Sequence, residues 1–419
     1  GTPTNANIWT YSVWIKRSFL TDQQCFFGAG TSASDRTEIT FSSADICNVY
    51  RNVSGSSVSI NTTMKFRDIS GWYNLVFQNN SGTLALYVNG EVATLSSSSL
   101  GTNRINQAST VHHIGDIIAT GSPLNALMSH INFVDGTIYA PSYFGETDAT
   151  TGEWKIKASP SVTYGNNGFF ILKDGNTITD SSPNSNNWSL ASGTLTKTED
   201  CPSNVFATLN TLERLGGSIT VSNGNTQFFN QASDWRTIIS NLAFPNTGKF
   251  YAEMQVNEVS SAVQVGIMAQ SSFVSHFQAD LGTQGQYNGY AYMNTGQKRT
   301  NSSASNYGNS FAGGIIGIAV DMDNKNIYFS KDGVWQNSGN PESGATGTNA
   351  AFTDLQNDKD YCFAVASQGS NPKVSWNFGN GYFGTTAVSS AGTNASGNGI
   401  FEYDTPTGYT ALSTKGLNL

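Results

Sequence analysis

Residues 313–334, GGIIGIAVDMDNKNIYFSKDGV, decide the fold of the C-terminal half of the chain. The run IIGIAVDMD is apolar and rich in β-branched residues, as expected of a buried strand, and NIYFS has the same character. The polar residues 323–326 join these runs and predict a tight antiparallel hairpin. Asp332 and Gly333 are residues that tolerate positive φ, so we expect a second reversal into residues 334–336.

Strand-like runs of the same kind flank this hairpin on both sides. They are GKFYAEM from Gly248, VGIM from Val265, GYAY from Gly289, YCFAVA from Tyr361 and VSWNFG from Val374. In order and residue type this succession resembles the SPRY (B30.2-like) domain family. The resemblance implies a β-sandwich that binds its partners through loops on one rim.

The N-terminal half begins with a strand of strict alternation, IWTYSVWIKRS at residues 8–18. Further short strands follow, and Asn89 with Gly90 between two of them is the strongest hairpin signal in the sequence. The quoted motifs are YSVWIK from Tyr11, GWYNLVF from Gly71, LYVNG from Leu86, HIGD from His113 and MSHINFVDG from Met128. They resemble a laminin G-like (LamG, concanavalin A-like) jelly roll over residues 8–139.

Residues 141–210 have a different character, with few periodic runs and many Asn, Ser and Gly residues. This length exceeds an ordinary loop, so we expect packed irregular chain or short strands docked on one sandwich. We therefore predict an all-β protein of two jelly-roll or concanavalin-like β-sandwiches joined by a packed irregular connector. The predicted parts are a LamG-like sandwich at 1–140, the connector at 141–210, and a SPRY-like sandwich with a C-terminal extension at 211–419.

The composition excludes two classes of partner. Charged residues make up 12% of the chain, and the net charge is −8. Nucleic-acid binding depends on clustered Lys and Arg, so no nucleic-acid partner is expected. No apolar run approaches the roughly 18 residues of a membrane span, so membrane insertion is not expected. The chain begins at Gly1 rather than Met, which indicates a processed chain or a start at an internal residue.

Four cysteines, Cys25, Cys47, Cys201 and Cys362, lie far apart and show no zinc-binding spacing. Cys25 and Cys47 lie on strands of one domain, and a disulfide between them is one alternative. The favoured interpretation is that all four are small buried thiols. So few cysteines fit assembly in a reducing cytosol.

Catalytic motifs are missing. Glycan hydrolases on a concanavalin-like fold carry Glu-x-Asp-x-Glu or a slightly longer variant on one strand, and no such spacing occurs. Glu253 stands alone in its strand, and the chain has no Gly-x-Ser-x-Gly elbow. His112 and His113 are adjacent and so point to opposite faces of a strand. We predict no catalytic residues and no enzymatic activity.

No cofactor is expected, with one exception that the LamG resemblance implies. LamG domains often hold one calcium ion at the sandwich rim, and Asp116, which follows His113-Ile-Gly, lies at that position. Asp116 is therefore the candidate calcium ligand; the alternative is a solvated loop aspartate.

The predicted ligand surface is an aromatic and amide-rich stretch of the C-terminal half. Tyrosines beside Asn and Gln stack on sugar faces or anchor protein partners. Strand alternation turns half of the tyrosines toward the core, and Tyr287, Tyr290 and Arg299 are expected near an outward rim. The predicted ligand-binding residues are Gln286, Tyr287, Tyr290, Tyr292, Arg299 and Tyr307.

A longer succession of motifs carries a third resemblance. It comprises the LamG-like strands, FGE from Phe144, TGEW from Thr151, YGNNGF from Tyr164, PSNVFATLN from Pro202, the SPRY-like strands and TPTGYTALST from Thr405. This order is similar to large virion proteins of marine tailed bacteriophages, cyanophages among them. The resemblance implies a non-enzymatic virion structural protein, in a tail fibre, baseplate or capsid-surface appendage, that presents lectin-like and SPRY-like modules to host-surface glycan or protein.

The expected location is the virion, an extracellular particle assembled in the host cytoplasm. Sandwich edges invite further strand pairing, and this chain has few Lys or Glu residues to block it. We therefore expect contacts with other virion proteins and with itself, in a homo-oligomer for which family analogy favours a trimer. Two alternatives stay open: a polysaccharide-degrading enzyme on a concanavalin-like fold, and a secreted bacterial adhesin.

Overall fold

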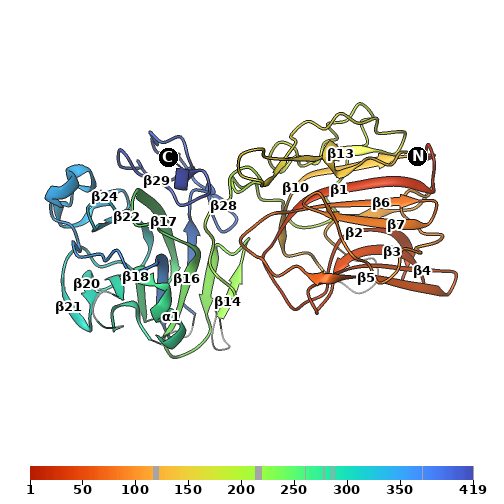
Figure 1. The fold of residues 1–419 in the computed structure, drawn as a ribbon. Coiled ribbons are helices and arrows are strands. Elements are labelled where there is room, and N and C mark those ends of the chain that lie inside the picture. Colours follow the sequence, from red (N-terminus) through yellow and green to blue (C-terminus); the bar gives the residue numbers. More distant parts are fainter. Residues whose placement is uncertain are drawn as a thin grey trace. The chain divides into compact units, whose positions relative to one another are not determined.

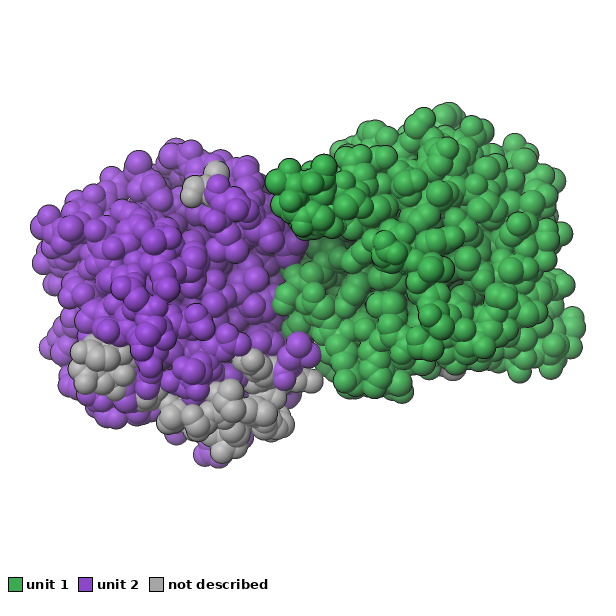
Figure 2. Space-filling view, in the orientation of Figure 1, with its two compact units in different colours: residues 1–197 green, residues 198–419 purple. Residues whose placement is uncertain are grey.

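The computed structural model describes residues 1–116, 122–212, 219–259, 261–276, 279–283, 285, 288–369 and 371–418. The chain forms two compact units, residues 1–197 and 198–419 (Figures 1 and 2). Strands dominate both units, and the described residues contain a single α-helix, α1 (Gln270–His276). The prediction of an all-β protein is confirmed.

Unit 1 contains two antiparallel sheets. The first has the spatial order β13 (Phe169–Ile171), β10 (Ala126–Asp135), β1 (Ile8–Arg17), β6 (Tyr73–Asn80), β7 (Thr83–Val88) and β8 (Glu91–Val92). The second has the order β5 (Ser56–Lys65), β4 (Ile46–Val53), β3 (Asp35–Phe41), β2 (Gln24–Ser32) and β9 (His112–His113). Aromatic rings fill the core between them, and the Tyr11 and Phe27 ring centroids lie 4.3 Å apart. Asn89 and Gly90 form the predicted turn between β7 and β8, with φ of 49° and 86°.

Strand β1 is buried on both faces, although its sequence alternates. Residues of the predicted connector cover the outer face, where Phe144, Tyr164 and Phe170 pack with Val76 and Val134. The same region supplies η1 (Pro141–Tyr143) and the hairpin of β11 (Gly145–Thr147) and β12 (Trp154–Ile156). Residues 141–197 thus belong to unit 1, whereas residues 198–210 belong to unit 2.

A buried carboxylate ties three loops of unit 1 together. Asp135, at the end of β10, accepts hydrogen bonds from the backbone amides of Thr4, Asn5 and Asn167 and from the side-chain amide of Asn106. Burial alone would raise the pKa of Asp135, but these donors outweigh burial and the pKa is lowered. Asp135 is therefore ionised in the folded protein, where it holds the N-terminal arm on the sandwich.

Unit 2 also contains two large sheets. The first has the order β14 (Ile219–Ser222), β15 (Gln227–Asn230), β26 (Lys373–Asn377), β17 (Lys249–Glu258), β22 (Gly314–Asp321), β23 (Asn326–Lys331) and β24 (Val334–Trp335), with β29 (Thr410–Ala411) pairing in parallel with β17. The second has the order β16 (Arg236–Ala243), β25 (Tyr361–Gln368), β18 (Ala262–Ala269), β19 (Gly289–Met293), β20 (Gln297–Thr300) and β21 (Ser303–Asn306). The remaining elements are η2 (Leu281–Thr283), η3 (Gln336–Ser338), η4 (Pro341–Thr346), η5 (Gly416–Asn418) and the hairpin of β27 (Tyr382–Phe383) and β28 (Thr386–Ala387).

The hairpins predicted from residues 313–334 are confirmed. Strands β22 and β23 pair from Ile316 with Lys331 to Asp321 with Asn326. Asp332 and Gly333 adopt φ of 49° and 79° and turn the chain into β24. Positive φ at both central residues is the twist that suits a two-residue hairpin loop.

The C-terminal segment covers the outer face of the first sheet of unit 2. Phe401, Tyr409 and Ala411 pack there against Tyr251 of β17 and Tyr328 of β23. Because both faces of this sheet are covered, its strands are continuously apolar rather than alternating. The C-terminal residues are part of the folded unit and not an appended tail.

All four cysteines are free, and Cys25, Cys47 and Cys362 are buried. Strand β3 lies between the strands that carry Cys25 and Cys47, so the alternative of a disulfide between them is wrong. In the described part of the chain, no helix has the length and hydropathy needed to cross a membrane.

We expect Gly333→Ala to destabilise the protein more than Gly408→Ala, although both glycines have a φ near +80° in unit 2. A methyl group at Gly408 meets no atom within 4 Å, so its cost of about 1–2 kcal/mol is backbone strain alone. A methyl group at Gly333 would lie 2.6 Å from the Tyr403 ring, which adds about 1–3 kcal/mol of overpacking. Urea unfolding of the full chain measures both losses, and equal losses would contradict this account of the turn.

Candidate binding site

An open recess in unit 2 is lined almost entirely by amide side chains. It has a volume of about 400 Å³ and lies between the segment after β21 and the short helix η3. The lining residues are Asn306, Tyr307, Gly308, Asn309, Gln336 and Asn337. We call this set the amide recess.

Buried hydrogen bonds hold the amide recess from beneath. The Gln336 side chain accepts a hydrogen bond from the Asn309 backbone amide at 2.8 Å and donates one to the Val334 carbonyl at 2.8 Å. The Tyr292 hydroxyl donates to the Asn309 carbonyl. The recess is therefore fixed by the hairpin of β23 and β24 on one side and by β19 on the other.

The exposed amides of the recess are available to a ligand. Asn306, Asn309 and Asn337 are exposed, and their side chains make no hydrogen bond within the described ranges. Each amide offers two donors and an acceptor with two lone pairs. Such groups recognise hydroxyl-rich ligands and exposed peptide backbone, which also present donors and acceptors together.

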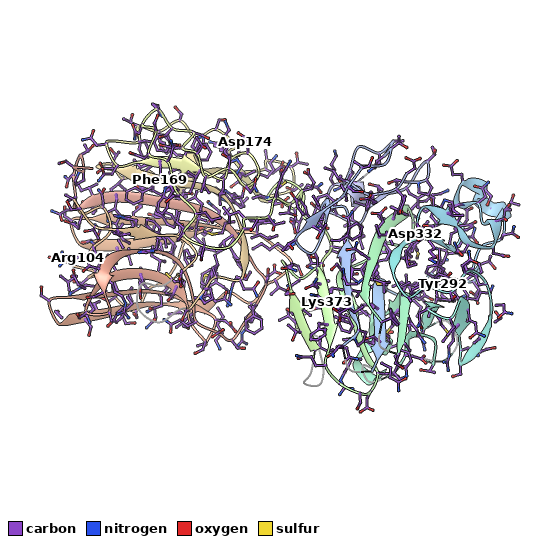
Figure 3. All side chains as sticks on the ribbon, turned by 180° about the vertical axis from the view of Figure 1, so that it is seen from behind. Arg104, Phe169, Asp174, Tyr292, Asp332 and Lys373 are labelled. Carbon is purple, nitrogen blue, oxygen red and sulfur yellow. The ribbon has the colours of Figure 1, made fainter. Side chains whose placement is uncertain are left out.

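The tyrosines of the predicted set that the structure describes are buried, whereas exposed positions were expected for ligand contacts. Tyr290 and Tyr292 are fully buried in the core of unit 2, and Tyr307 is 7% exposed. Tyr292 is labelled among the side chains of unit 2 in Figure 3. Tyr290 and Tyr292 are two residues apart on β19, so they share its core face. The prediction that Tyr290 lies near an outward rim is wrong, because its ring packs against Phe352 and Tyr361.

Of the remaining predicted residues, one is described by the structure and two are not. Arg299 is partly exposed and forms an ion pair with the buried Asp280 at 2.9 Å, away from the amide recess. Gln286 and Tyr287 lie outside the described residues. Of the predicted set, Tyr307 lines the recess and Tyr292 supports it.

The sequence reasoning missed the amides that form the recess. Tyrosines were predicted because aromatic rings often contact ligands, but the rings of Tyr290 and Tyr292 pack in the core of unit 2. The available signal was position: asparagines and a glutamine directly follow a strand end at Asn306 and a strand end at Trp335. Residues at strand ends occupy loops, where side chains are free to contact a partner.

A second polar surface lies on the five-stranded sheet of unit 1. Ile39 and Phe41 of β3 face the core, so Arg36 and Glu38 face outward. Arg36 pairs with Glu38 at 2.8 Å and lies 5.0 Å from the centre of the Tyr50 ring. The Glu38 carboxylate is therefore paired with a cation on this face.

Asp116 is exposed at the end of the first described range. Across the described residues, His, Cys, Asp and Glu side chains form no group of three or more suited to a metal ion. Calcium normally takes six to eight oxygen ligands, so Asp116 would need backbone carbonyls and water to complete a site.

Glu253 on β17 is a buried carboxyl group of unit 2 with a raised pKa. It is fully buried, and burial raises its pKa from 4.5 to about 7. Its oxygens accept hydrogen bonds from the Tyr251 hydroxyl, the Asn377 amide and the backbone amides of Glu402 and Tyr403. With four donors and no exposure, Glu253 anchors the C-terminal segment and cannot reach a substrate.

Comparisons with known proteins agree with the two folds. Residues 2–142 match the family model of the concanavalin A-like lectin/glucanases superfamily (Laminin_G_3), and residues 247–381 match that of the SPRY domain. The predicted LamG-like and SPRY-like domains are thereby confirmed. No curated protein matches the chain.

The solved structures that are similar to part of this chain include the following two. The SPRY domain of human HERC1 is 14% identical over 40% of this chain and 96% of that chain, with a TM-score of 0.32. The stonustoxin structure is 16% identical over 41% of this chain and 27% of that chain, with a TM-score of 0.31. This chain thus spans about a quarter of the stonustoxin chain.

We expect Glu253 to make the protein less stable as the pH rises. Since its folded pKa of about 7 exceeds the unfolded value of 4.5, the folded state binds the proton more tightly. This contribution is fully present below about pH 4.5 and is lost as the pH rises through 7. The measurement is the difference in unfolding free energy between the protein and Glu253→Gln from pH 4 to 8.

Glu253→Gln should also lower stability at neutral pH by about 1–3 kcal/mol, because its NH₂ group faces a backbone amide donor. Glu258→Gln, at an exposed position of the same strand, is the control and should change stability little. A pH-independent difference between the protein and Glu253→Gln would show that Glu253 does not titrate in this way.

Proposed function

We propose that this chain, in which a concanavalin A-like domain precedes a SPRY domain, is a non-enzymatic virion structural protein of a tailed bacteriophage that contacts the host surface. Both domains are of a binding or structural kind. A place in a tail fibre, baseplate or capsid-surface appendage is consistent with the low content of charged residues. In this proposal the SPRY domain supplies the contact surface, and the ligand is a host-surface glycan or protein.

The amide recess carries the proposal. Among its six lining residues, Tyr307 alone is titratable, and burial raises its pKa far above neutrality. Neither a carboxylate nor a histidine, cysteine or serine lines the recess. A site with these groups forms and breaks hydrogen bonds but provides no general acid, general base or nucleophile. It supports recognition without chemistry.

Self-association follows from the edge of the second sheet of unit 2. Strand β21 ends that sheet, and its residues, Ser303 to Asn306, are all exposed and uncharged. An exposed edge without charge or proline pairs readily with another strand. Repeated copies would raise the avidity of weak contacts at each amide recess, because tethered sites act at high effective concentration.

Removal of the recess amides should weaken attachment. We expect Asn309→Ala with Asn337→Ala to reduce binding of the purified chain to a panel of immobilised bacterial surface polysaccharides and cell-surface proteins by about tenfold, since two lost hydrogen bonds are worth roughly 1–3 kcal/mol. The control is Asn357→Ala, which removes an exposed amide outside the recess.

Unchanged binding in the double variant would exclude the amide recess as the contact site. Release of reducing sugar from any polysaccharide of the panel, abolished by a single Asp or Glu substitution, would overturn the non-enzymatic part of the proposal.

We expect the purified chain to be oligomeric, with a trimer as the first expectation. Sedimentation velocity gives the mass, and Ala304→Lys, which adds a charge to the exposed edge of β21, should shift the oligomer toward monomer. A stable monomer at micromolar concentration would refute self-association, and an oligomer that Ala304→Lys leaves intact would exclude this edge as the interface.

A further inference from the structure

A second recess opens in unit 2, on the other side of η3 from the amide recess. Its volume is about 400 Å³, and it is lined by Trp335, Gly339, Asn340, Pro341, Glu342, Thr393, Asp404, Thr405, Pro406 and Thr407. Five of these ten residues lie at positions 393–407, beyond the SPRY match that ends at residue 381. We call it the tryptophan recess. The C-terminal segment, and not the SPRY domain alone, completes it.

Hydrogen bonds fix the two walls of the tryptophan recess to each other. Glu342 Oε1 accepts the Thr407 backbone amide at 2.6 Å, and the Tyr409 hydroxyl donates to the Pro341 carbonyl at 3.1 Å. Asp404 Oδ1 accepts both the amide and the hydroxyl of Thr393, at 2.7 and 2.8 Å. A recess held in this way is preorganised, so a ligand pays little ordering cost on binding.

The floor of the recess combines apolar rings with unused hydrogen-bonding groups. Pro341 and Pro406 are buried, and Trp335 is partly buried with its ring edge-to-face on Tyr251. Thr405 is 7% exposed, and its hydroxyl has no hydrogen-bond partner. The Trp335 indole N–H makes no hydrogen bond to any described residue. A buried hydroxyl without a partner is destabilising, and a ligand that bonds to it would remove that cost.

Charge restricts the ligand further. Glu342 and Asp404 are the ionisable residues of the lining, and both are acidic. Each uses one carboxylate oxygen for the contacts above, which leaves the other as an acceptor. Without Lys, Arg or His in the lining, an anionic ligand such as a phosphate or uronate would be repelled.

We propose that the tryptophan recess binds a neutral saccharide. The indole and proline rings match the apolar face of a pyranose, and sugar hydroxyls both donate to the carboxylates and accept from the indole N–H and Thr405. A lysine or arginine side chain from a protein partner would satisfy the carboxylates alone. Neither side chain has an acceptor, so the indole N–H would need a carbonyl from elsewhere in the partner. The saccharide is therefore the ligand that uses all the groups present.

The test is saturation-transfer NMR and calorimetry on the full chain. The probes are the methyl pyranosides of glucose, galactose, mannose and N-acetylglucosamine with their β-linked disaccharides; glucuronate and arginine methyl ester are the charged comparisons. We expect binding of at least one neutral probe and none of glucuronate. Failure of every neutral probe, or binding of arginine methyl ester in their place, overturns the proposal.

Thr405→Val separates a ligand role from a structural one. Valine keeps the shape and removes a hydroxyl that has no partner in the protein, so the unfolding temperature should stay the same or rise. Saccharide affinity should fall about tenfold, because one hydrogen bond from a desolvated site is lost. Trp335→Phe, which removes the indole N–H, should weaken binding similarly.

A control locates the effect. Thr353→Val changes an exposed threonine outside both recesses and should not alter saccharide affinity. Unchanged affinity in both Thr405→Val and Trp335→Phe would overturn the assignment. Since the tryptophan recess shares no lining residue with the amide recess, its failure is distinguishable from failure of the proposed function.

Discussion

The four hydrogen bonds that the buried Glu253 carboxyl group accepts stabilise the observed packing of the C-terminal segment in unit 2. Two of them join the middle of β17 to residues 402 and 403, so the C-terminal segment lies on the outer face of the first sheet. The other two come from Tyr251 and Asn377. Only with that segment in place are Tyr251 and Tyr328 out of water. Burying a carboxyl group is costly by itself, and the apolar surface that the segment covers offsets that cost.

In unit 1, irregular chain likewise covers the apolar outer face of a sheet. Its six-stranded sheet also has an outer face of apolar residues, and irregular chain covers it through Phe144, Tyr164 and Phe170. Buried carboxylates again hold the covering chain: Asp135 binds the N-terminal arm, and Asp180 accepts hydrogen bonds from the amides of Phe170, Ser182 and Asn186. The three buried carboxylates of Asp135, Asp180 and Glu253 thus bind backbone amides inside the protein, where a neutral side chain would supply fewer acceptors.

This construction explains where ligand sites are found. A segment that covers a sheet meets the loops at the end of that sheet, and a recess forms between the segment and the loops. The tryptophan recess is such a margin, with one wall from η4 and one from the C-terminal segment. The amide recess forms at a sheet end where the buried Tyr292 and Gln336 fix the loops. In both recesses, buried core residues position the exposed side chains of the lining.

The sequence by itself determined the fold class, the main strands along the chain and their hairpins, because these depend on local pattern: β-branched runs, and Asn-Gly or Asp-Gly pairs that accept positive φ. The order of the strands within each sheet comes from the tertiary structure. It also pointed to the region of β19 to β21. Only the tertiary structure decided which side chains of that region meet a ligand. Tyr290 and Tyr292 lie on the same face of β19, as the alternation of side chains along a strand predicts. Whether that face is covered depends on β25 and on residues about 60 positions away, such as Phe352. The burial of Glu253 likewise depends on residues 402 and 403, about 150 positions later. Local pattern carries no information about such distant contacts, and those contacts determine burial, pKa and the walls of each recess.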